Sequence, residues 1–523
     1  MTVEVLIDAA KLDELFAPLA PPGSPGFAVG IAHHGVPAYR RGFGLASVEL
    51  PLTLSPSIRM RVGSTTKHFG ALCIMLLAED GKLSPQDSLR RHLPELPGWA
   101  DAMTLAQVMG HIAGVRCTID IQTYFDGSVG KAAPVPDGTE FKLLASLDSP
   151  NFAPGENWSY SNGGYTLLTE VIERVSGMKW GEFLKARVLD PIGMSDTIAR
   201  PVDSDCLPNS ATLHVKRPDG GYDKGFFGVP ISATGSIVST VDDMLRWLAH
   251  MSKPVVGTAA TWQAMRAPGR LNSGASTAYG YGLITSEYRG LELLHHGGSV
   301  VGGNSQMLKV PAHEFDVTLM VNSDVVNALD LVEKVMDACF SGLAEKREPG
   351  KGANLVGNFY SRRSARVLSF VEHEGETYRQ AGKDKALVPR DPNGNLITRV
   401  SFVDYRPIMP AGDGVTLTEL GIEDHYERVS PPAESGTPAI LGQYANKSSG
   451  LSLTVEAGEG EAAAMTLHGN VGKMHYGLTE LAPGLWKGLA TEGKAPLEPI
   501  IERDGTALMM SSGRNWRLRF EPA

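Results

Sequence analysis

The amino-acid sequence predicts an α+β protein whose first part mixes strands and helices and whose last part consists of strands. Three observations lead to this prediction. Apolar runs with strand character occur early and late in the first part, with helical spacing between them. The composition changes at a charged, Gly- and Pro-containing stretch, "AEKREPGKGAN", over residues 344–354. Beyond it the pattern is short alternating strands and turns. We therefore expect an α+β unit followed by two β-units, each long enough for a small meander or barrel.

The strands of the first part lie near its two ends. Phe27 to His33 is apolar and extended, His34-Gly35 is a turn, and Val36 to Phe43 returns as a second strand. Leu291 to His296 and Asp316 to Val321 are predicted as later strands.

The helices are predicted between and after these strands. One opens at Gly63-Ser64 and continues to Gly81; it is apolar almost all round, so we expect it to be buried. Asp242 to His250 and Leu331 to Leu343 show helical apolar spacing.

The last part of the chain repeats itself. The segment "LVGNFYSRRSARVLSFVEHEG" begins at Leu355 and aligns without gaps with "ILGQYANKSSGLSLTVEAGEG", which begins at Ile440. The alignment pairs Gly357 with Gly442, Phe359 with Tyr444, Leu368 with Leu453 and Gly375 with Gly460. Chance similarity between two β-rich segments is the alternative. We expect three domains: 1–345, 355–435 and 436–523.

Composition limits the possible partners and compartments. The 523 residues carry a net charge of -10, which argues against nucleic acid or an anionic membrane as the main partner. The start lacks the basic and apolar regions of a secretory signal, although a cleaved signal stays an alternative. No stretch is apolar for long enough to span a bilayer. The scattered cysteines favour a reduced, cytoplasmic protein without a metal or cofactor: Cys73, Cys117, Cys206 and Cys339.

The first candidate catalytic motif is Ser64-x-x-Lys67, in "VGSTTKHFG". Residues i and i+3 share one face of a helix, and a serine in the first turn lies in the positive field of the helix N-terminus. A lysine one turn further on can hold or relay the serine proton. This arrangement is a known catalytic motif, but a chain of this length contains roughly one or two such pairs by chance.

Two further motifs complete the constellation. In "WSYSNGG", Tyr160-x-Asn162 offers a phenol, which becomes a useful base only beside a cation such as Lys67, and an amide for the substrate. In "ELLHHGGSVVGG" the register is ambiguous; we choose His296-x-Gly298 because the spacing to the following glycines then fits an H-x-G-x-x-x-G strand end. Gly298 would let a substrate backbone approach the strand edge. The neighbouring His295 is expected to be a core residue.

Together, these motifs and their flanks resemble the serine β-lactamase-like family, which includes class C β-lactamases, D,D-peptidases, D-aminopeptidases and related esterases. "PGFAVGIAHHGVPAYRRGFGLAS" resembles the family's opening hairpin, "RVGSTTKHF" its nucleophile helix and "FAPGENWSYSNGGYTLL" its Tyr-x-Asn loop. The resemblance covers essentially the first 340 residues. It is strongest to the D-aminopeptidase branch, which carries two C-terminal β-barrels and uses H-x-G where β-lactamases use K-T-G.

The resemblance implies a serine hydrolase that works through an acyl-enzyme. Ser64 would attack a carbonyl, and Tyr160, kept partly anionic by Lys67, would accept the proton. The backbone N–H groups of Ser64 and Ser299 would form the oxyanion hole, and His296 would bond to the Tyr160–Lys67 network or to the substrate.

The preferred substrate is an amide or short peptide with an N-terminal D-amino acid. A neutral histidine in place of the K-T-G lysine should weaken recognition of a substrate carboxylate. Alternatives are a carboxylesterase or another peptidase of the family, and a non-catalytic penicillin-binding protein. A homodimer is possible.

The last barrel raises one more question. In the D-aminopeptidase branch a long loop from this barrel enters the active site and helps to bind the substrate amine. The corresponding stretch here, "KGLATEGKAPLEP", is shorter. One interpretation is that Leu489 to Glu498 reaches the site, with Glu492 and Glu498 as acids and Lys494 opposing them. The other is that the β-units are structural or oligomerising additions.

Overall fold

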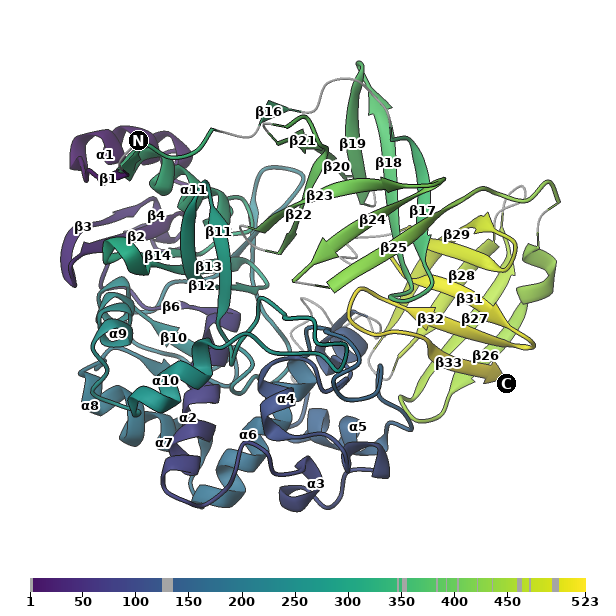
Figure 1. Ribbon diagram of the computed structural model, residues 1–523, viewed down its shortest axis with the longest axis horizontal. Helices are drawn as coiled ribbons and strands as arrows, with labels where there is room; N and C mark the ends of the chain where they lie inside the picture. The colour runs from purple at the N-terminus through teal and green to yellow at the C-terminus, as the bar shows by residue number, and fades with distance from the viewer. Residues whose placement is uncertain are drawn as a thin grey trace.

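The computed structural model describes residues 3–124, 135–345, 348–349, 355–381, 384–391, 393–401, 404–420, 422–434, 436–458, 463–469, 472–491 and 498–523. A mixed unit of helices and sheet occupies one side of the molecule, and two all-β units occupy the other (Figure 1). Within the described part of the chain, every helix is too short or too polar to cross a membrane.

The central sheet joins strands from both ends of the mixed unit. Its order is β11-β12-β13-β14-β2-β3, and all neighbours are antiparallel. The strands are β11 (Ile284–Tyr288), β12 (Leu291–Val300), β13 (Gly303–Val310), β14 (Phe315–Val321), β2 (Phe27–His33) and β3 (Val36–Phe43). The bounds of β2 and β3 confirm the prediction. Pairing of the early β2 with the late β14 closes the sheet and confirms the α+β class.

Helices cover both faces of this sheet because its strands are buried on both sides. Val29 and Ile31 of β2 pack with α1 (Ala9–Phe16) and α11 (Ala328–Cys339), whereas Ala28 and Ala32 face the core that contains α9 (Val241–Ser252). This two-face alternation follows from the period of two along a strand. The helix predicted to end at Leu343 ends at Cys339, because Phe340–Ser341 pairs as a short strand with Glu4–Val5.

The helix that carries the Ser-x-x-Lys motif is buried, as predicted. Its first turn is a 3₁₀ helix, η2 (Gly63–Thr66), and the α-helix α2 (Lys67–Glu79) continues from it. Every residue from Lys67 to Leu77 is buried. Around it lie η4 (Asp120–Tyr124), α4 (Leu105–Met109), α5 (Thr139–Ser146), α6 (Asn162–Ser176), α7 (Trp180–Leu184) and α10 (Ala259–Arg266).

The two C-terminal units differ in closure. The second, from β26 (Gly442–Asn446) to β33 (Leu518–Pro522), is a closed antiparallel barrel of eight strands, as expected. The first is an eight-stranded antiparallel sheet of order β20-β19-β18-β17-β25-β24-β23-β22. Within its described residues, the edge strands β20 (Asp384–Leu387) and β22 (Ile397–Ser401) do not pair with each other. This unit is therefore a half-barrel.

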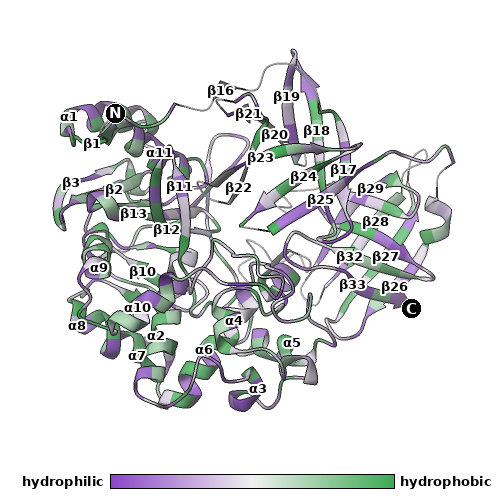
Figure 2. Ribbon diagram, in the orientation of Figure 1, coloured by the Kyte–Doolittle hydropathy of each residue, from purple (hydrophilic) through white to green (hydrophobic). Residues whose placement is uncertain are grey.

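The repeated segments adopt similar local structure. Gly357 and Gly442 open the first strand of each unit with positive φ values of 126° and 147°, a region that favours glycine. The aligned Phe359 and Tyr444 are both buried. Hydrophobic and hydrophilic residues alternate along the barrel strands β27 (Leu451–Ala457) and β28 (Ala463–His468), as Figure 2 shows. The alternation lets each strand bury one face inside the barrel.

Candidate active site

Ser64 lies where the strand β12 crosses the first turn of the nucleophile helix. Gly63 has a φ of +52°, and a β-carbon added there would lie 2.8 Å from the Ser299 backbone nitrogen. A β-carbon on Gly298 would lie only 1.9 Å from the Val62 carbonyl oxygen. The space at Gly298 is therefore taken by the nucleophile turn rather than by a substrate backbone. These glycines bring the N–H groups of Ser64 and Ser299 to the same place.

Lys67 has three hydrogen-bond partners around its amino group. Its Nζ lies 2.8 Å from Asn162 Oδ1, 2.8 Å from the Thr234 carbonyl oxygen and 3.3 Å from Ser64 Oγ. The side chain is completely buried. Burial lowers the pKa of Lys67 well below its usual value, and the positive charge of Arg514 acts in the same direction. A buried amine with a lowered pKa can accept a proton from a neighbouring hydroxyl.

Tyr160 and Asn162 flank the start of α6. The Ser161 side chain caps this helix by accepting a hydrogen bond from a backbone N–H of the first turn. The Tyr160 ring lies beside Lys67, whose Nζ is 4.7 Å from the ring centroid. Asn162 directs its oxygen to Lys67 and its amide nitrogen to Cys117 Sγ, at 3.4 Å. The structure thus brings Ser64, Lys67, Tyr160 and Asn162 together, with Asn162 holding the lysine.

The expectation that Lys67 keeps Tyr160 partly anionic stays a prediction, and the direction of the Tyr160 pKa shift argues against it. Burial raises the pKa of the Tyr160 phenol above its usual value, and the nearby Ser64 hydroxyl and the charge of Arg514 oppose this only in part. The phenol is therefore neutral at pH 7. The Ser64 hydroxyl lies close enough to act on the pKa of this phenol, so the phenol is placed to exchange a proton with Ser64.

The ring nitrogens of His296 contact Tyr279 and Gly297, and its ring lies 6.4 Å from that of Tyr160, so its expected role in the Lys67–Tyr160 network stays a prediction. Nε2 lies 2.9 Å from the Tyr279 hydroxyl, and Nδ1 lies 2.6 Å from the Gly297 carbonyl oxygen. The ring is completely buried, and burial lowers its pKa well below the usual value. His296 is therefore neutral, as expected.

The chosen register is consistent with the position of Gly298 against the nucleophile turn. His295 on the opposite face of β12 is a core residue, as predicted, with Nε2 2.9 Å from the Ser286 hydroxyl.

A loop of the last barrel that the sequence did not suggest lies beside the site. Within Leu489 to Glu498, residues 492–497 lie outside the described residues, and Glu498 forms an ion pair of 2.8 Å with Lys487. The loop between β32 (Ala507–Ser511) and β33, residues 512–517, instead places Arg514 over the Tyr160 ring, with 5.2 Å between the guanidinium carbon and the ring centroid.

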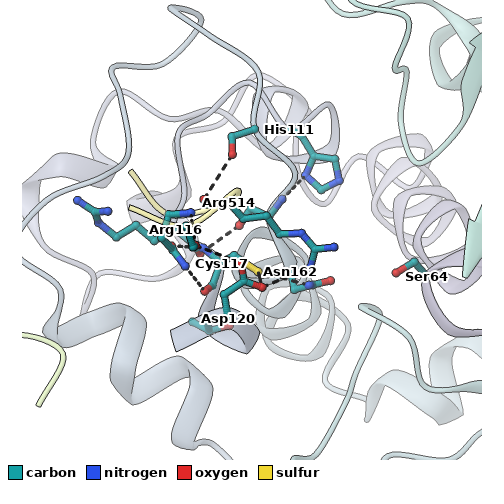
Figure 3. A network of polar contacts seen from close by, with 12 residues as sticks. Ser64, His111, Arg116, Cys117, Asp120, Asn162 and Arg514 are labelled. Carbon is teal, nitrogen blue, oxygen red and sulfur yellow. Dashed lines mark hydrogen bonds and ion pairs between the residues drawn. The ribbon is translucent and has the colours of Figure 1, made fainter. Parts of the chain in front are cut away.

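Sequence reasoning also missed Asp120, His111 and the Thr234 carbonyl. The Asp120 carboxylate is completely buried and lies 3.4 Å from Arg514 Nη1. The His111 ring packs 4.4 Å from the Tyr160 ring, and its Nδ1 accepts a hydrogen bond from the Ser161 N–H. The segments that contain these residues, such as "GHIAG", could be aligned with the family, but their roles depend on contacts that have no local pattern. Figure 3 shows the polar contacts around Cys117, Asp120 and Arg514, with Ser64 to one side of them.

The described residues contain no group of three histidine, cysteine or carboxylate side chains placed to bind a metal ion. The arrangement brings together a serine hydroxyl, a buried amine and a buried phenol.

Comparisons with known proteins agree with this geometry. Curated relatives include a D-aminopeptidase from Brucella canis (strain ATCC 23365 / NCTC 10854 / RM-666), 26% identical over 354 residues, which is 67% of this chain and 66% of the relative. Another, from Gluconobacter oxydans (strain 621H), is 23% identical over 302 residues, which is 57% of this chain and 56% of the relative. The chain thus spans slightly less than two thirds of the first of these relatives and just over half of the second.

Solved structures share the fold. The octameric penicillin-binding protein homologue from Pyrococcus abyssi superposes with a TM-score of 0.56 at 20% identity, covering 98% of this chain and 100% of that chain. The D-amino acid amidase from Ochrobactrum anthropi SV3, complexed with L-phenylalanine amide, gives a TM-score of 0.52 at 21% identity, covering 63% of this chain and 98% of that chain.

The family model described as Beta-lactamase matches residues 12–337, which is more than half of the 523 residues. This match includes the nucleophile helix, the Tyr-x-Asn loop and the strand β12. The chain therefore belongs to the β-lactamase family.

Proposed function

We propose that this protein is a serine hydrolase that cleaves amides or short peptides through an acyl-enzyme and releases an N-terminal D-amino acid. The observation that carries the proposal is the position of Lys67: its buried amino group connects Ser64 to Asn162 and the Thr234 carbonyl. The D-amino acid preference is supported by relatives named D-aminopeptidase.

The geometry around Lys67 favours it as the first proton acceptor. A neutral amine has two N–H donors and one lone pair. The two shorter contacts, to Asn162 and Thr234, use the donors, and the lone pair then faces the Ser64 hydroxyl at 3.3 Å. Ser64 Oγ attacks the substrate carbonyl as its proton passes to Lys67, and the N–H groups of Ser64 and Ser299 stabilise the oxyanion.

Tyr160 is proposed to deliver a proton to the leaving amine. Its phenol is neutral and adjacent to both Ser64 and Lys67, so a proton can pass from the lysine through the phenol to the departing nitrogen. Water then hydrolyses the acyl-enzyme by the same route in reverse. His296 supports the site through Tyr279 rather than by transferring this proton.

The test combines covalent labelling with a substrate panel. An active-site serine reagent such as a fluorophosphonate is expected to label the protein once, and Ser64→Ala is expected to abolish both labelling and turnover. Ser57→Ala, at an exposed serine of the same unit, is the matched control and should label at the normal rate. Intact-protein mass spectrometry measures both. Equal labelling of Ser64→Ala and the unmodified protein would disprove the role of Ser64.

The panel contains D- and L-alanine p-nitroanilides, p-nitrophenyl esters and nitrocefin. We expect the D-alanine anilide to be hydrolysed with a higher kcat/KM than the L-alanine anilide. Hydrolysis of the esters alone would identify a carboxylesterase, and hydrolysis of nitrocefin alone would identify a β-lactamase. Labelling without turnover of any substrate would favour a penicillin-binding protein.

We further propose that residues 1–345, 355–435 and 436–523 are the three domains and that the protein acts in the reducing cytoplasm as a homodimer. Four cysteines that form no disulfide support the reducing compartment. Limited proteolysis tests the boundaries, and light scattering measures the oligomeric state.

A further inference from the structure

The loop of residues 512–517 docks on the catalytic unit through paired hydrogen bonds. Asn515 uses its whole amide: Oδ1 accepts from the Cys117 N–H at 3.0 Å, and Nδ2 donates to the Cys117 carbonyl at 3.1 Å. The Trp516 N–H donates to Asn151 Oδ1 at 3.0 Å, and its carbonyl accepts from Arg116 Nη1 at 2.9 Å. Asn515, Trp516 and Arg116 are buried in this contact. The loop is therefore held in a single position against residues 116–120 and 149–159.

This docking directs Arg514 to the candidate active site. Asn151 Nδ2 donates to the Arg514 carbonyl at 2.8 Å, which fixes the backbone of this residue. Its guanidinium group lies 5.2 Å from the centroid of the Tyr160 ring and 3.4 Å from the buried Asp120 carboxylate. In Figure 3 the guanidinium group lies between His111 and Asn162, on the side of the network that faces Ser64. The side chain remains partly exposed.

Asp120 is the residue that orients this guanidinium group. Its other oxygen lies 3.5 Å from the Ser512 hydroxyl, and Cys117 Sγ contacts the same carboxylate oxygen as Arg514 at 3.4 Å. A completely buried carboxylate is costly unless it is paired. The pair therefore holds Arg514 in one orientation over Tyr160, with Lys67 also beside that ring.

We propose that Arg514 is a positioning residue of the hydrolase: supplied by the C-terminal barrel, it holds the Tyr160 ring and places a fixed positive charge beside the Ser64–Lys67–Tyr160 cluster. This inference rests on the proposed function, in which Tyr160 and Lys67 exchange the proton of Ser64. It assigns a role in proton transfer to the second β-unit, which otherwise has only a supporting role.

The charges around Tyr160 make Arg514 influential. Titratable groups from every element around this ring face it or its immediate neighbours. These elements are the nucleophile helix, the 111–120 segment, α5, α6, the 279–281 segment, β12 and the barrel loop. The groups are Lys67, His111, Cys117, Asp120, Glu140, Tyr165, Tyr279, Tyr281, His296 and Arg514. His111 and His296 are neutral because burial lowers their pKa values, and burial raises the pKa of Cys117 to about 11.

The charge of Arg514 lowers the pKa values of both Lys67 and Tyr160. A proton acceptor and a proton donor are thus shifted in the same direction. Removing the charge should raise both pKa values; between pH 5 and 10 this moves the acidic limb of the kcat/KM profile, which reports Lys67, to higher pH. A purely structural contact would change the height of the profile without moving it.

The experiment compares full-length Arg514→Met, Arg514→Lys and Arg519→Met with the unmodified protein. Arg519 is an arginine of the same barrel whose ion pairs are with Asp504 and Glu521, so its replacement is the matched control. The readouts are kcat/KM between pH 5 and 10 for the best substrate of the panel, and the rate of labelling by the serine reagent over the same range.

We expect Arg514→Met to lower kcat/KM at pH 7 by roughly tenfold or more and to shift the acidic limb of the profile, which reports Lys67, upward by about half a pH unit or more. Arg514→Lys should restore the position of the profile while recovering only part of the rate, because an ammonium group keeps the positive charge but cannot stack on the Tyr160 ring as a planar guanidinium group does. Arg519→Met should match the unmodified protein.

An unchanged acidic limb of the kcat/KM profile in Arg514→Met would overturn the inference, and so would an equal shift of that limb in Arg519→Met. Circular dichroism and thermal unfolding report whether a variant folds; if Arg514→Met does not fold, the comparison of Arg514→Lys with the unmodified protein decides, since a preserved profile position with a lowered rate is expected. Failure of the proposed function is distinguishable, because it would leave the unmodified protein itself without labelling at Ser64.

Discussion

Glu140 buries a carboxyl group between α5 and α6, and this makes the stability of the catalytic unit depend on pH. Its two oxygens accept hydrogen bonds from Thr166 Oγ1 at 2.6 Å and from Thr118 Oγ1 at 3.4 Å. Burial raises the pKa of Glu140 from 4.5 to about 7, although these hydrogen bonds and the charge of Lys67 oppose the shift. Between these two pKa values the folded protein binds a proton that the unfolded chain has lost.

The sign and size of the effect follow from proton linkage. Because the folded-state pKa is the higher one, the contribution of Glu140 is most favourable below pH 4.5, falls as the pH rises toward 7 and is constant above that. Compared with a side chain that stays neutral, ionisation of Glu140 lowers the free energy of unfolding by about 0.8 kcal/mol at pH 5 and by about 3.3 kcal/mol at pH 8. Glu140→Gln keeps the shape without the titration. The free energy of unfolding of Glu140→Gln, relative to that of the unmodified protein, should therefore increase by about 2.5 kcal/mol from pH 5 to pH 8.

The assay is urea unfolding of full-length Glu140→Gln and unmodified protein at pH 5 and pH 8, followed by tryptophan fluorescence. Other titrating groups are common to both proteins, so they cancel in the difference. Glu287→Gln, at an exposed position on β11, is the control. Its free energy of unfolding should differ from that of the unmodified protein by the same amount at both pH values. Glu140 also lines a cavity of about 910 Å³ beside α6. If water there solvates the carboxylate, the difference for Glu140→Gln will not change with pH, and the reasoning is refuted.

Two further predictions concern the catalytic geometry. Gly298→Ala should lower kcat by at least about a hundredfold, because the new β-carbon would lie 1.9 Å from the Val62 carbonyl oxygen and displace the nucleophile turn. The control is Gly98→Ala, where the new β-carbon has only a side-chain atom 3.8 Å away, and it should have the kcat of the unmodified protein. Equal kcat values for the two variants would contradict this prediction. In a double-mutant cycle, Lys67→Ala with Tyr160→Phe should be little slower than the slower single variant, because the two groups act as a unit; additive losses in kcat would mean that they act separately.

Much of the fold followed from local patterns. The two strands Phe27–His33 and Val36–Phe43 have the predicted bounds because a His-Gly turn separates two extended runs. The buried helix after Ser64 followed from periodicity, and the repeat predicted a second β-unit after Gly442, whereas its closure into a barrel was implied only by the family resemblance. The end of α11 did not: its pattern continues past Cys339, but pairing with an N-terminal strand stops the helix there.

The same division holds for the candidate site. Ser64 and Lys67 are one helical turn apart, so their contact is encoded in the spacing of three residues, and the Tyr-x-Asn motif similarly places Tyr160 and Asn162 at the start of one helix. Their mutual approach across 95 residues was inferred only from the resemblance to a family.

The sequence by itself determined the reactive residue types, their order and the class of fold, because these depend on short-range spacing and on the hydrophobic period. Tertiary structure alone decided the charge state of Tyr160, the turning of His296 toward Tyr279 and the arrival of Arg514 beside Tyr160. Each of these depends on burial or on contacts between segments far apart in the chain. A pKa is set by the medium and the charges that surround a group, and those surroundings exist only after the barrel has packed against the catalytic unit.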